Sequence, residues 1–381
     1  MNNYQDIPTY QENGQTIKVK DYYNSLFRYI KVVDASRLYL PDMDLGETCY
    51  EYMFSECSSL IAVPALPATG LAKECYKDMF GACESLVAVP KNYLSAGTDV
   101  EQGCYKSMFN WCYNLTGLPD LPSLYLESYC YANMFEGLTG LTKVPIDLPA
   151  TTLAPWCYYN MFRNCWSLTS APVLSATSLA TACYYEMFYG CSSLIVAPEL
   201  PATTLKQSCY DGMFEGCKSL TEAPVLSATT LANDCYWHMF TNCSSLSSIN
   251  VSFTNWGVNT NTYYWVSGVP STGIFYKPAE LSTIIANSSN YYSKIPSGWT
   301  VINKDQPQPE PSAVPLTFTG LSSTNAIRLQ AHGSPDPIVL KAKINDGDWN
   351  SVTVDQNTYY TARLNQGDTI AFSGANDHFS T

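Results

Sequence analysis

Residues 183–198 read CYYEMFYGCSSLIVAP, and their frame, C-Y-x-x-M-F-x-x-C-x-x-L-x-x-x-P, occurs eight times in the chain. The copies begin at Cys49, Cys75, Cys104, Cys130, Cys157, Cys183, Cys209 and Cys235. The tyrosine, the Met-Phe pair and the leucine are present in every copy, and only the last copy replaces the proline, with Asn250. A fixed period of 26 to 29 residues indicates stacked units that bury one continuous core, because a single unit cannot bury its apolar face alone.

The apolar positions of each copy, counted from the first cysteine, are 0, 1, 4, 5 and 8. They lie on one face of a 3.6-residue period, so we predict a short helix between the two cysteines. The leucine and proline that follow predict a short extended segment. Thr and Ser before the next copy suit helix N-caps. Together these features predict an α/β repeat solenoid, leucine-rich-repeat-like, of about eight 26-residue units.

All fifteen cysteines occupy the two cysteine positions of the frame, and Leu138 fills the one remaining slot. A helix would place sulfurs at C-x7-C spacing roughly 12 Å apart, which excludes a disulfide within one helix, and this spacing is unlike that of structural zinc sites. Disulfides between units stay open, although an odd count leaves one thiol free. We favour a buried column of small apolar side chains. The predicted structural core includes Cys49, Cys57, Met53, Phe54, Leu60, Cys183, Cys191 and Met187.

The composition changes along the chain and predicts five segments. Residues 1–35 are an N-terminal segment or cap, 36–250 the solenoid, with a half-unit before Cys49, and 251–304 an aromatic C-terminal cap. Residues 305–315, DQPQPEPSAVP, are a proline-rich linker, and 316–381 alternate in period two, which predicts a small all-β, Ig-like sandwich. That domain stops short at Thr381, so we expect that the natural chain continues or that another chain completes it.

The net charge of −13 disfavours binding to nucleic acid and to anionic membrane surfaces. No stretch approaches the roughly 20 apolar residues that span a bilayer, so membrane insertion is not expected. The polar start at residues 1–20 has no secretory signal pattern. Either the chain is not exported by that route or Met1 begins a trimmed sequence.

Residues with catalytic or metal-binding chemistry are sparse. The histidines are His238, His332 and His378, and none has a neighbouring metal-ligand pattern. Recognised nucleophile, zinc-protease and phosphate-loop motifs are missing from the sequence. A calcium site at Asp346 and Asp348 is conceivable, but N-D-G-D is more typical of a hairpin turn. We therefore expect neither an enzyme nor a cofactor or metal.

The positions that vary between copies are the candidate binding residues. If the frame faces inward, we expect aromatic side chains at these positions to face outward, where they would stack on sugars or on a protein partner. The alternative is that a tyrosine-rich repeat simply tolerates exposed rings. The candidates are Trp111, Tyr113, Tyr159, Trp166, Tyr185, Tyr189 and Trp237.

The frame, the LPATTLA linker at 148–154 and the WVSGV and IPSGW sequences near the end resemble BspA-like leucine-rich repeats of Bacteroidetes surface proteins, over roughly residues 36–303. The resemblance implies a curved right-handed solenoid that adheres to a protein or surface glycan, with no catalytic residues. Such repeats also occur in tail or fibre proteins of phages that infect gut Bacteroidetes. We therefore expect an extracellular binding and structural protein. It is either a virion tail or fibre component, where homo-oligomers or virion assembly are expected, or a bacterial cell-surface adhesin.

Overall fold

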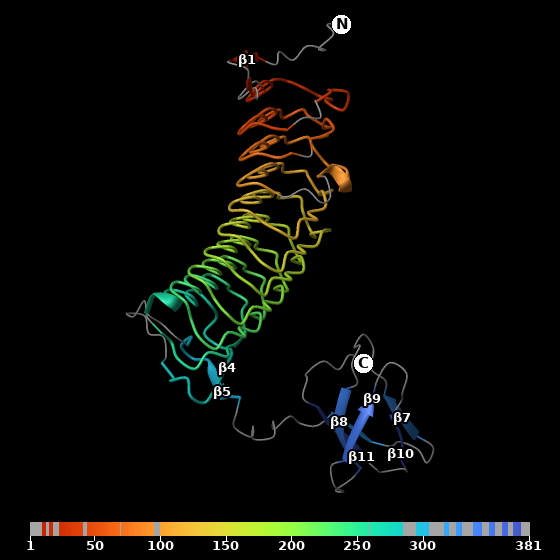
Figure 1. Ribbon diagram of the computed structural model, residues 1–381. Coiled ribbons are helices and arrows are strands. Elements are labelled where there is room, and N and C mark those ends of the chain that lie inside the picture. The colour runs from red at the N-terminus through yellow and green to blue at the C-terminus, as the bar shows by residue number, and fades with distance from the viewer. Residues whose placement is uncertain are drawn as a thin grey trace. The chain divides into compact units, whose positions relative to one another are not determined.

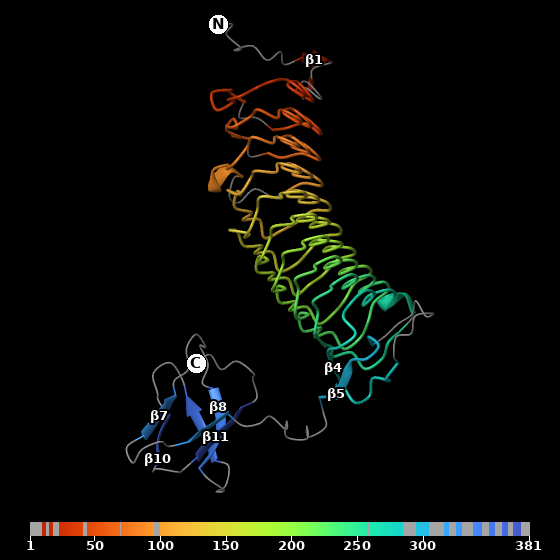
Figure 2. The ribbon, with the colours of Figure 1, turned by 180° about the vertical axis from the view of Figure 1, so that it is seen from behind.

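The computed structural model divides the chain into two units, Met1–Gln306 and Pro307–Thr381. In the first unit it describes residues 10–12, 15–17, 23–40, 44–68, 70–94, 100–257, 259–284 and 295–304. In the second it describes the six strands β6 to β11. Figures 1 and 2 show the first unit as a stack of rungs, which run from the red N-terminal end to β4 and β5.

The helix predicted between the two cysteines is wrong, and the described residues contain no α-helix. That segment is a succession of turns in which every fourth residue has a positive φ, as at Ala182, Glu186 and Gly190. Within the rung, N–H groups donate to carbonyls three residues earlier, such as Met187 to Tyr184 at 3.2 Å. A left-handed residue at every fourth position interrupts an α-helix, which needs negative φ throughout.

The error in the prediction has a simple physical cause. A turn that repeats every four residues places positions 0, 1, 4, 5 and 8 on one side, as a period of 3.6 does. Over nine residues the two periods coincide. The predicted N-caps and the helical estimate of the sulfur separation are therefore wrong as well.

Backbone donors in the turn segment alternate between two directions. One N–H closes a turn within its rung, and the next donates to the following rung, as Glu186 does to the Asp211 carbonyl at 2.8 Å and Phe188 to the Met213 carbonyl at 3.0 Å. A rung on its own would leave about half of these donors unpaired. Each unit therefore depends on its neighbour for backbone hydrogen bonds as well as for its core.

The extended segments form a parallel ladder on another side of each rung. Isolated bridges join Ser170 to Val196, Val196 to Glu222 and Glu222 to Ser248. The ladder continues as a parallel sheet in the order β3-β4-β5, formed by Ser248–Asn250, Ile274–Lys277 and Thr300–Asn303. In its register Ser248 pairs with Ile274, which pairs with Thr300.

Rungs of the same kind lie beyond both ends of the predicted solenoid, 36–250. At the N-terminal end, Phe27 N–H donates to the Met53 carbonyl at 2.9 Å. At the other end, Phe240 N–H donates to the Trp265 carbonyl at 2.8 Å. The segments that we expected to be caps, 1–35 and 251–304, thus contribute rungs, because the backbone pattern tolerates side chains outside the frame.

Two columns of stacked rings run through the core. Tyr158 and Tyr184 have ring centroids 5.7 Å apart and 9° between their planes, and Phe162 and Phe188 follow at 5.8 Å and 4°. The columns reach Tyr23 and Phe27 in the first described rung. The frame methionines are buried in the same core, where a flexible thioether fills the space between rungs.

All fifteen cysteines are free and buried. The second cysteine of a unit donates its S–H to the phenylalanine carbonyl of the previous unit, as Cys191 Sγ does to Phe162 O at 3.1 Å. The same bond forms from Cys57, Cys83, Cys112, Cys165, Cys217 and Cys243. Leu138 fills the fourth slot without such a donor and is fully buried. Packing therefore defines this slot, and the S–H bond is an addition to it.

The second unit is entirely β where it is described. Its strands are β6 Leu316–Thr319, β7 Asn325–Leu329, β8 Ile338–Ile344, β9 Asn350–Val354, β10 Tyr360–Leu364 and β11 Thr369–Gly374. They form two antiparallel sheets, β10-β7 and β6-β11-β8-β9. The Ig-like assignment stays a prediction. His332, His378, Asp346 and Asp348 lie outside the described residues.

Four short elements complete the first unit. The strands β1 (Tyr10–Glu12) and β2 (Gln15–Ile17) pair antiparallel. There are also two 3-10 turns, η1 (Lys91–Tyr93) and η2 (Asn259–Thr262), and Asn261 in η2 accepts the Tyr236 N–H at 3.0 Å, as the turn segment of a rung does. No helix in the described part of the chain is long and apolar enough to cross a membrane.

Candidate functional site

The variable side chains between the two cysteines of each rung form a surface that we call the turn face. It consists of the residues two, three, six and seven places after the first cysteine, which in one rung are Tyr185, Glu186, Tyr189 and Gly190. Backbone bonds hold successive rungs together, so residues at the same place in neighbouring rungs form columns. A side chain on this face therefore contacts its counterparts before and after it.

Most of the candidate aromatic residues are less exposed than the sequence suggested. Tyr113 and Trp166, with 39% and 54% of their surface exposed, are the only two candidates in the exposed class. The half-buried candidates are Trp111, Tyr159, Tyr185, Tyr189 and Trp237. The reason is the column arrangement, because each ring is partly covered by the neighbouring rung.

The structure brings several candidate rings into contact with one another. Tyr159 stacks on Tyr185 with centroids 5.2 Å apart, and Trp111 meets Tyr113 edge to face at 6.3 Å. Trp237 packs edge to face against Tyr263 at 5.6 Å, a residue of the segment that we had predicted to be a cap. The rings therefore form pairs along the stack, and no single cluster collects all of them.

Arg163 lies at the centre of an ion-pair network that the sequence analysis missed. Its guanidinium contacts Glu186 and, at 3.7 Å, Glu136. Its Cζ lies 4.1 Å from the centroid of the Tyr189 ring. Glu136, Arg163 and Tyr189 occupy the same place in three successive units, so writing the copies in register would have predicted this contact. The network joins three rungs and stabilises the stack.

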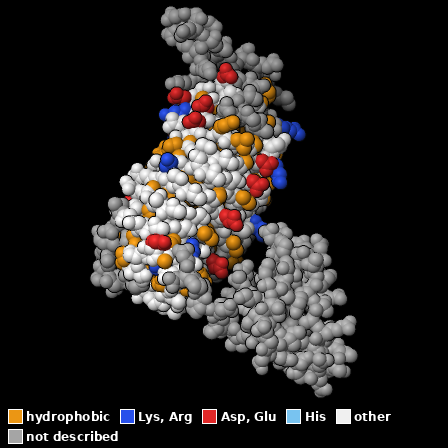
Figure 3. Space-filling view, turned by 60° about the horizontal axis from the view of Figure 1, so that its bottom comes forward, with side chains coloured by type: hydrophobic (Ala, Val, Ile, Leu, Met, Phe, Trp, Pro, Cys, Tyr) orange, Lys and Arg blue, Asp and Glu red, His pale blue; other side chains and the backbone are white. Residues whose placement is uncertain are grey.

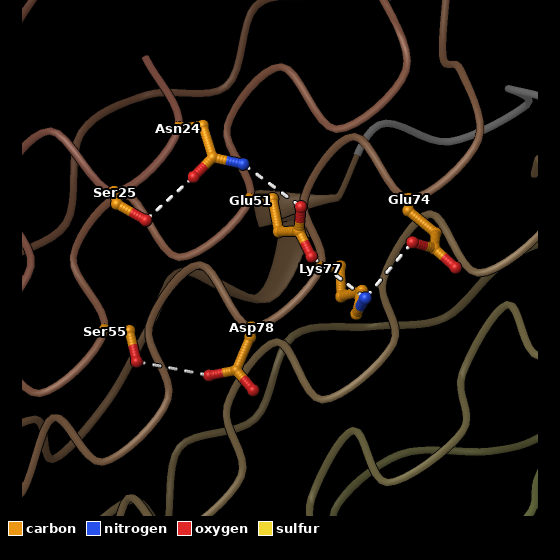
Figure 4. Close-up of polar contacts among 7 residues, drawn as sticks. All are labelled: Asn24, Ser25, Glu51, Ser55, Glu74, Lys77 and Asp78. Atoms are coloured by element: carbon orange, nitrogen blue, oxygen red, sulfur yellow. Dashed lines mark hydrogen bonds and ion pairs between the residues drawn. The ribbon is translucent and has the colours of Figure 1, made fainter. Parts of the chain in front are cut away.

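A second polar network joins the first rungs (Figure 4). Lys77 Nζ lies 2.9 Å from Glu51 and 3.1 Å from Glu74, and Asn24 donates to Glu51 at 3.1 Å. Burial opposes the charge on Lys77, but hydrogen bonds to the two carboxylates outweigh it and raise its pKa. Every charged group in this chain of contacts has a partner, which is typical of structural networks on solenoid surfaces.

Asp78 lies beside this network and accepts a hydrogen bond from the Ser55 hydroxyl at 3.3 Å (Figure 4). Burial raises the pKa of the Asp78 carboxyl to about 6. The nearby positive charges of Arg28 and Lys77 oppose that shift. The carboxyl is therefore held in the rung by burial and one hydroxyl donor.

Acidic groups gather farther along the turn face. Asp211 is only 7% exposed, and burial, together with the charges of Asp234 and Glu215, raises the pKa of its carboxyl to about 8. His238 Nδ1 lies 3.6 Å from Glu215, and burial lowers the histidine pKa. Among the described residues, no group of three or more His, Cys, Asp and Glu side chains is placed to hold a metal ion.

The thiols are poor candidates for reactive chemistry. Burial raises the pKa of Cys75 and Cys130 to about 12, and it raises the pKa of Cys191 as well. A buried, protonated thiol is inert, because the thiolate is the reactive form. The cysteines therefore supply packing and S–H donors, as their positions beneath the turn face require.

A shallow pocket of about 340 Å³ lies near the end of the ladder, lined by Thr254, Asn255, Trp256, Gly257, Glu280, Ser282 and Ile284. Trp256 donates its indole N–H to the Ser282 carbonyl at 2.8 Å. Glu280 is the one ionisable side chain among these lining residues. The pocket therefore lacks the paired groups that acid–base chemistry uses.

On the face drawn in Figure 3, Asp and Glu side chains occur together with Lys and Arg side chains, and much of the surface between them is neutral or apolar. Exposed aliphatic residues lie near the ladder, where Ile61 and Val87 occupy the same place in successive rungs, and Val173, Val196 and Val225 follow farther along the stack. The described surface therefore offers apolar, aromatic and neutral polar groups for contact.

Comparison with known proteins identifies the repeats. A family model described as the BspA type leucine rich repeat region matches residues 105–236 and 159–269, in six copies. No curated protein and no solved structure matches the sequence at a significant level. The matched region contains the Arg163 network, the Tyr159–Tyr185 pair and the exposed ring of Trp166.

Proposed function

We propose, because the repeats of this chain belong to the BspA-type leucine-rich repeat family, that the protein is a non-enzymatic binding module that works outside the cell. Repeats of this kind act in protein interaction and adhesion, and leucine-rich repeat families are typically binding modules rather than enzymes. The contact is made by the turn face together with the exposed residues that follow the second cysteine of a rung, such as Tyr113 and Trp166.

One observation supports this proposal above the others, which is the contrast between a constant frame and a variable turn face. The frame residues form the ring columns and the S–H bonds, and the backbone makes the bonds between rungs. The turn face contributes little to either. Many of its residues can therefore vary at a modest cost in stability, as a recognition surface requires.

The chemistry of the turn face also favours binding over catalysis. At the border of this face, the rings of Trp166 and Tyr113 are exposed on a rigid scaffold, and aromatic side chains of this kind are enriched among binding hot spots. His238 lies beside the carboxylate of Glu215, and the thiols, which could act as nucleophiles if exposed, are buried. These features support the choice of a binding module.

For the biological setting we propose a tail or fibre component of a phage of gut Bacteroidetes, which contacts the host surface or other virion proteins. The alternative setting is an adhesin on a bacterial cell surface. Both follow from the family resemblance. In the first setting the chain functions within a virion assembly or as several copies.

The binding function is tested with the full chain, labelled with a fluorophore and added to intact cells of a panel of gut Bacteroidetes. We expect saturable attachment to some strains, displaced by excess unlabelled chain. The proposal would be overturned if, on every strain in the panel, attachment were neither saturable nor displaced by unlabelled chain. The setting is tested by mass spectrometry of purified virions and of shaved bacterial surface peptides. Peptides in virions support the phage setting, and peptides from shaved cells alone support the adhesin.

A further inference from the structure

The residue that follows the second cysteine in each rung lies at the corner between the turn face and the ladder, and these residues form what we call the corner column. Its members are Ser58, Glu84, Tyr113, Thr139, Trp166, Ser192, Lys218 and Ser244. Tyr113 and Trp166 are its two aromatic members and are exposed by 39% and 54%. Thr139 lies between them in the stack and is half-buried.

The spacing of the two rings is set by the backbone. Gly140 N–H donates to the Tyr113 carbonyl at 2.9 Å, and Gly137 N–H donates to the Arg163 carbonyl at 2.8 Å, so backbone bonds join both steps from the rung of Tyr113 to that of Trp166. Neighbouring strands of a ladder lie about 4.8 Å apart, so two rungs separate the Tyr113 and Trp166 backbones by about 10 Å. The two rings lie in one column with only the small Thr139 between them.

The Tyr113 ring is supported from one side. Trp111 meets it edge to face with centroids 6.3 Å apart, and the Trp111 indole itself rests on Gly137 of the next rung. A ring held in this way loses little conformational freedom when a ligand stacks on it, which favours affinity.

Glu84 precedes Tyr113 in the corner column, but the interval from Tyr113 to Trp166 carries no charge at this position. Between Glu84 and Lys218, every residue of the corner column is uncharged. The position after it is also uncharged in these rungs, where it holds Asn114, Gly140, Ser167 and Ser193. The corner thus offers two aromatic faces with hydroxyl, amide and backbone groups beside them. It lacks the basic residues that bind phosphate and the broad apolar core of a protein interface.

We propose that the corner column from Tyr113 to Trp166 binds a neutral glycan chain that runs across the rungs, a proposal that deepens the binding function above and rests on it. The C–H face of one sugar stacks on Tyr113 and that of a later sugar stacks on Trp166. The sugar hydroxyls bond to the side chains between the rings. The net charge of −13 argues for a neutral polysaccharide over an anionic one.

The test measures binding of the full chain to soluble neutral glycans by isothermal titration calorimetry and by quenching of tryptophan fluorescence. The probes are β-1,4-glucan, β-1,3-glucan, α-1,4-glucan and mannan oligosaccharides of two to eight sugars. We expect at least one series to bind. Its affinity should rise steeply once the oligosaccharide is long enough to reach both rings.

The substitutions W166A and Y113A should each reduce the affinity about tenfold or more, as for hot-spot rings that become buried by the ligand on binding. Y113F, which keeps the ring, should retain most of the binding. The matched control is Y125A, because Tyr125 is 78% exposed but lies outside the corner column. Near-ultraviolet circular dichroism verifies that each variant is folded.

Two outcomes would overturn the glycan proposal and leave the binding function intact. The first is saturable attachment to cells that W166A and Y113A leave unchanged. The second is attachment that these substitutions abolish while no neutral glycan binds, which would point to a protein partner. If the wild-type chain attaches to nothing, the binding function itself fails, so the two failures are distinguishable.

Discussion

The indole ring of Trp111 lies over Gly137 of the next rung, so that a Cβ on Gly137 would overlap the six-membered part of the ring. Both residues have a positive φ, 57° at Trp111 and 75° at Gly137. Asn164 covers Gly190 and Asn242 covers Gly268 in the same way. The side chain at one left-handed position thus occupies the space above the equivalent position of the next rung, where a glycine leaves room for it.

The substitution G137A should therefore destabilise the solenoid by more than its backbone conformation alone explains. An L-residue with positive φ costs about 1 to 2 kcal/mol, and the clash with Trp111 should add about 1 to 3 kcal/mol. Urea unfolding followed by tryptophan fluorescence measures the loss in free energy of unfolding.

The matched control is G216A. Gly216 has the same φ of 75°, but the atom nearest to its Cβ position is 3.5 Å away, so only the backbone cost should appear. The double variant W111A/G137A should recover most of the additional loss. Equal effects of G137A and G216A would contradict the contact with Trp111.

The fifteen thiols should be unreactive in the folded protein. All are buried, and burial raises the thiol pKa at core positions such as Cys112, where the pKa is about 12, so little thiolate forms near pH 8. Protein that has been reduced and then freed of the reductant is titrated with a disulfide reagent at pH 8. Almost no thiol should react in native buffer, and all fifteen should react in guanidinium chloride. Rapid labelling of several thiols in the native protein would show that the core is open.

Stability should depend on pH through Asp211. Burial raises the folded pKa of its carboxyl to about 8 from an ordinary value of 3.8. The folded state therefore holds the proton more tightly than the unfolded state. The contribution of Asp211 is fully present below about pH 4 and is lost as the pH rises through about 8.

The substitution D211N should be more stable than the wild type at pH 8, on the order of 1 kcal/mol, and the advantage should disappear toward pH 4. Urea midpoints measured between pH 4 and pH 8.5 give both curves. The control is D120N, because Asp120 is exposed. The difference in urea midpoint between D120N and the wild type should be the same at every pH. Parallel curves for D211N and the wild type would contradict the raised pKa.

The substitution R163A should destabilise the stack by about 1 to 2 kcal/mol, because Glu136 and Glu186 would lose their shared partner and Tyr189 its cation. R163K should recover only part of this loss, since an ammonium cannot stack on the ring and pair with two carboxylates as a planar guanidinium does. Urea unfolding at low and high salt separates the ionic part from the stacking part. Full recovery by R163K would show that charge alone matters.

The repeat and the identity of its core residues could be predicted from the sequence. The period and the inward positions, such as Tyr184 and Phe188, follow from the frame alone, because apolar residues that recur at fixed spacing must share one buried side. The conformation of the segment could not be predicted, because nine residues do not separate a period of 3.6 from one of 4.0. Glu186 has a left-handed φ, but glutamate is a residue type that favours helices. Its identity therefore does not indicate this conformation.

The candidate site was only partly predictable. The aromatic candidates were found because they vary against a constant frame, but the exposure of Trp166 and the covering of Tyr159 by Tyr185 depend on the residues one rung away. The Arg163 network required the units to be placed in register, and the S–H bonds from Cys191 and its counterparts required the backbone itself.

The sequence by itself determined that the chain repeats, which side chains of each unit are buried, and that a separate β unit follows. Only the tertiary structure decided that the units are turns without helices, that further rungs lie beyond the frame, and that Tyr113 and Trp166 are exposed while the other aromatic candidates are partly covered. The physical reason is that periodicity is a property of one chain segment. Backbone pairing and exposure in a solenoid are instead set by the rungs above and below, which are about 26 residues away in sequence and about 4.8 Å away in space.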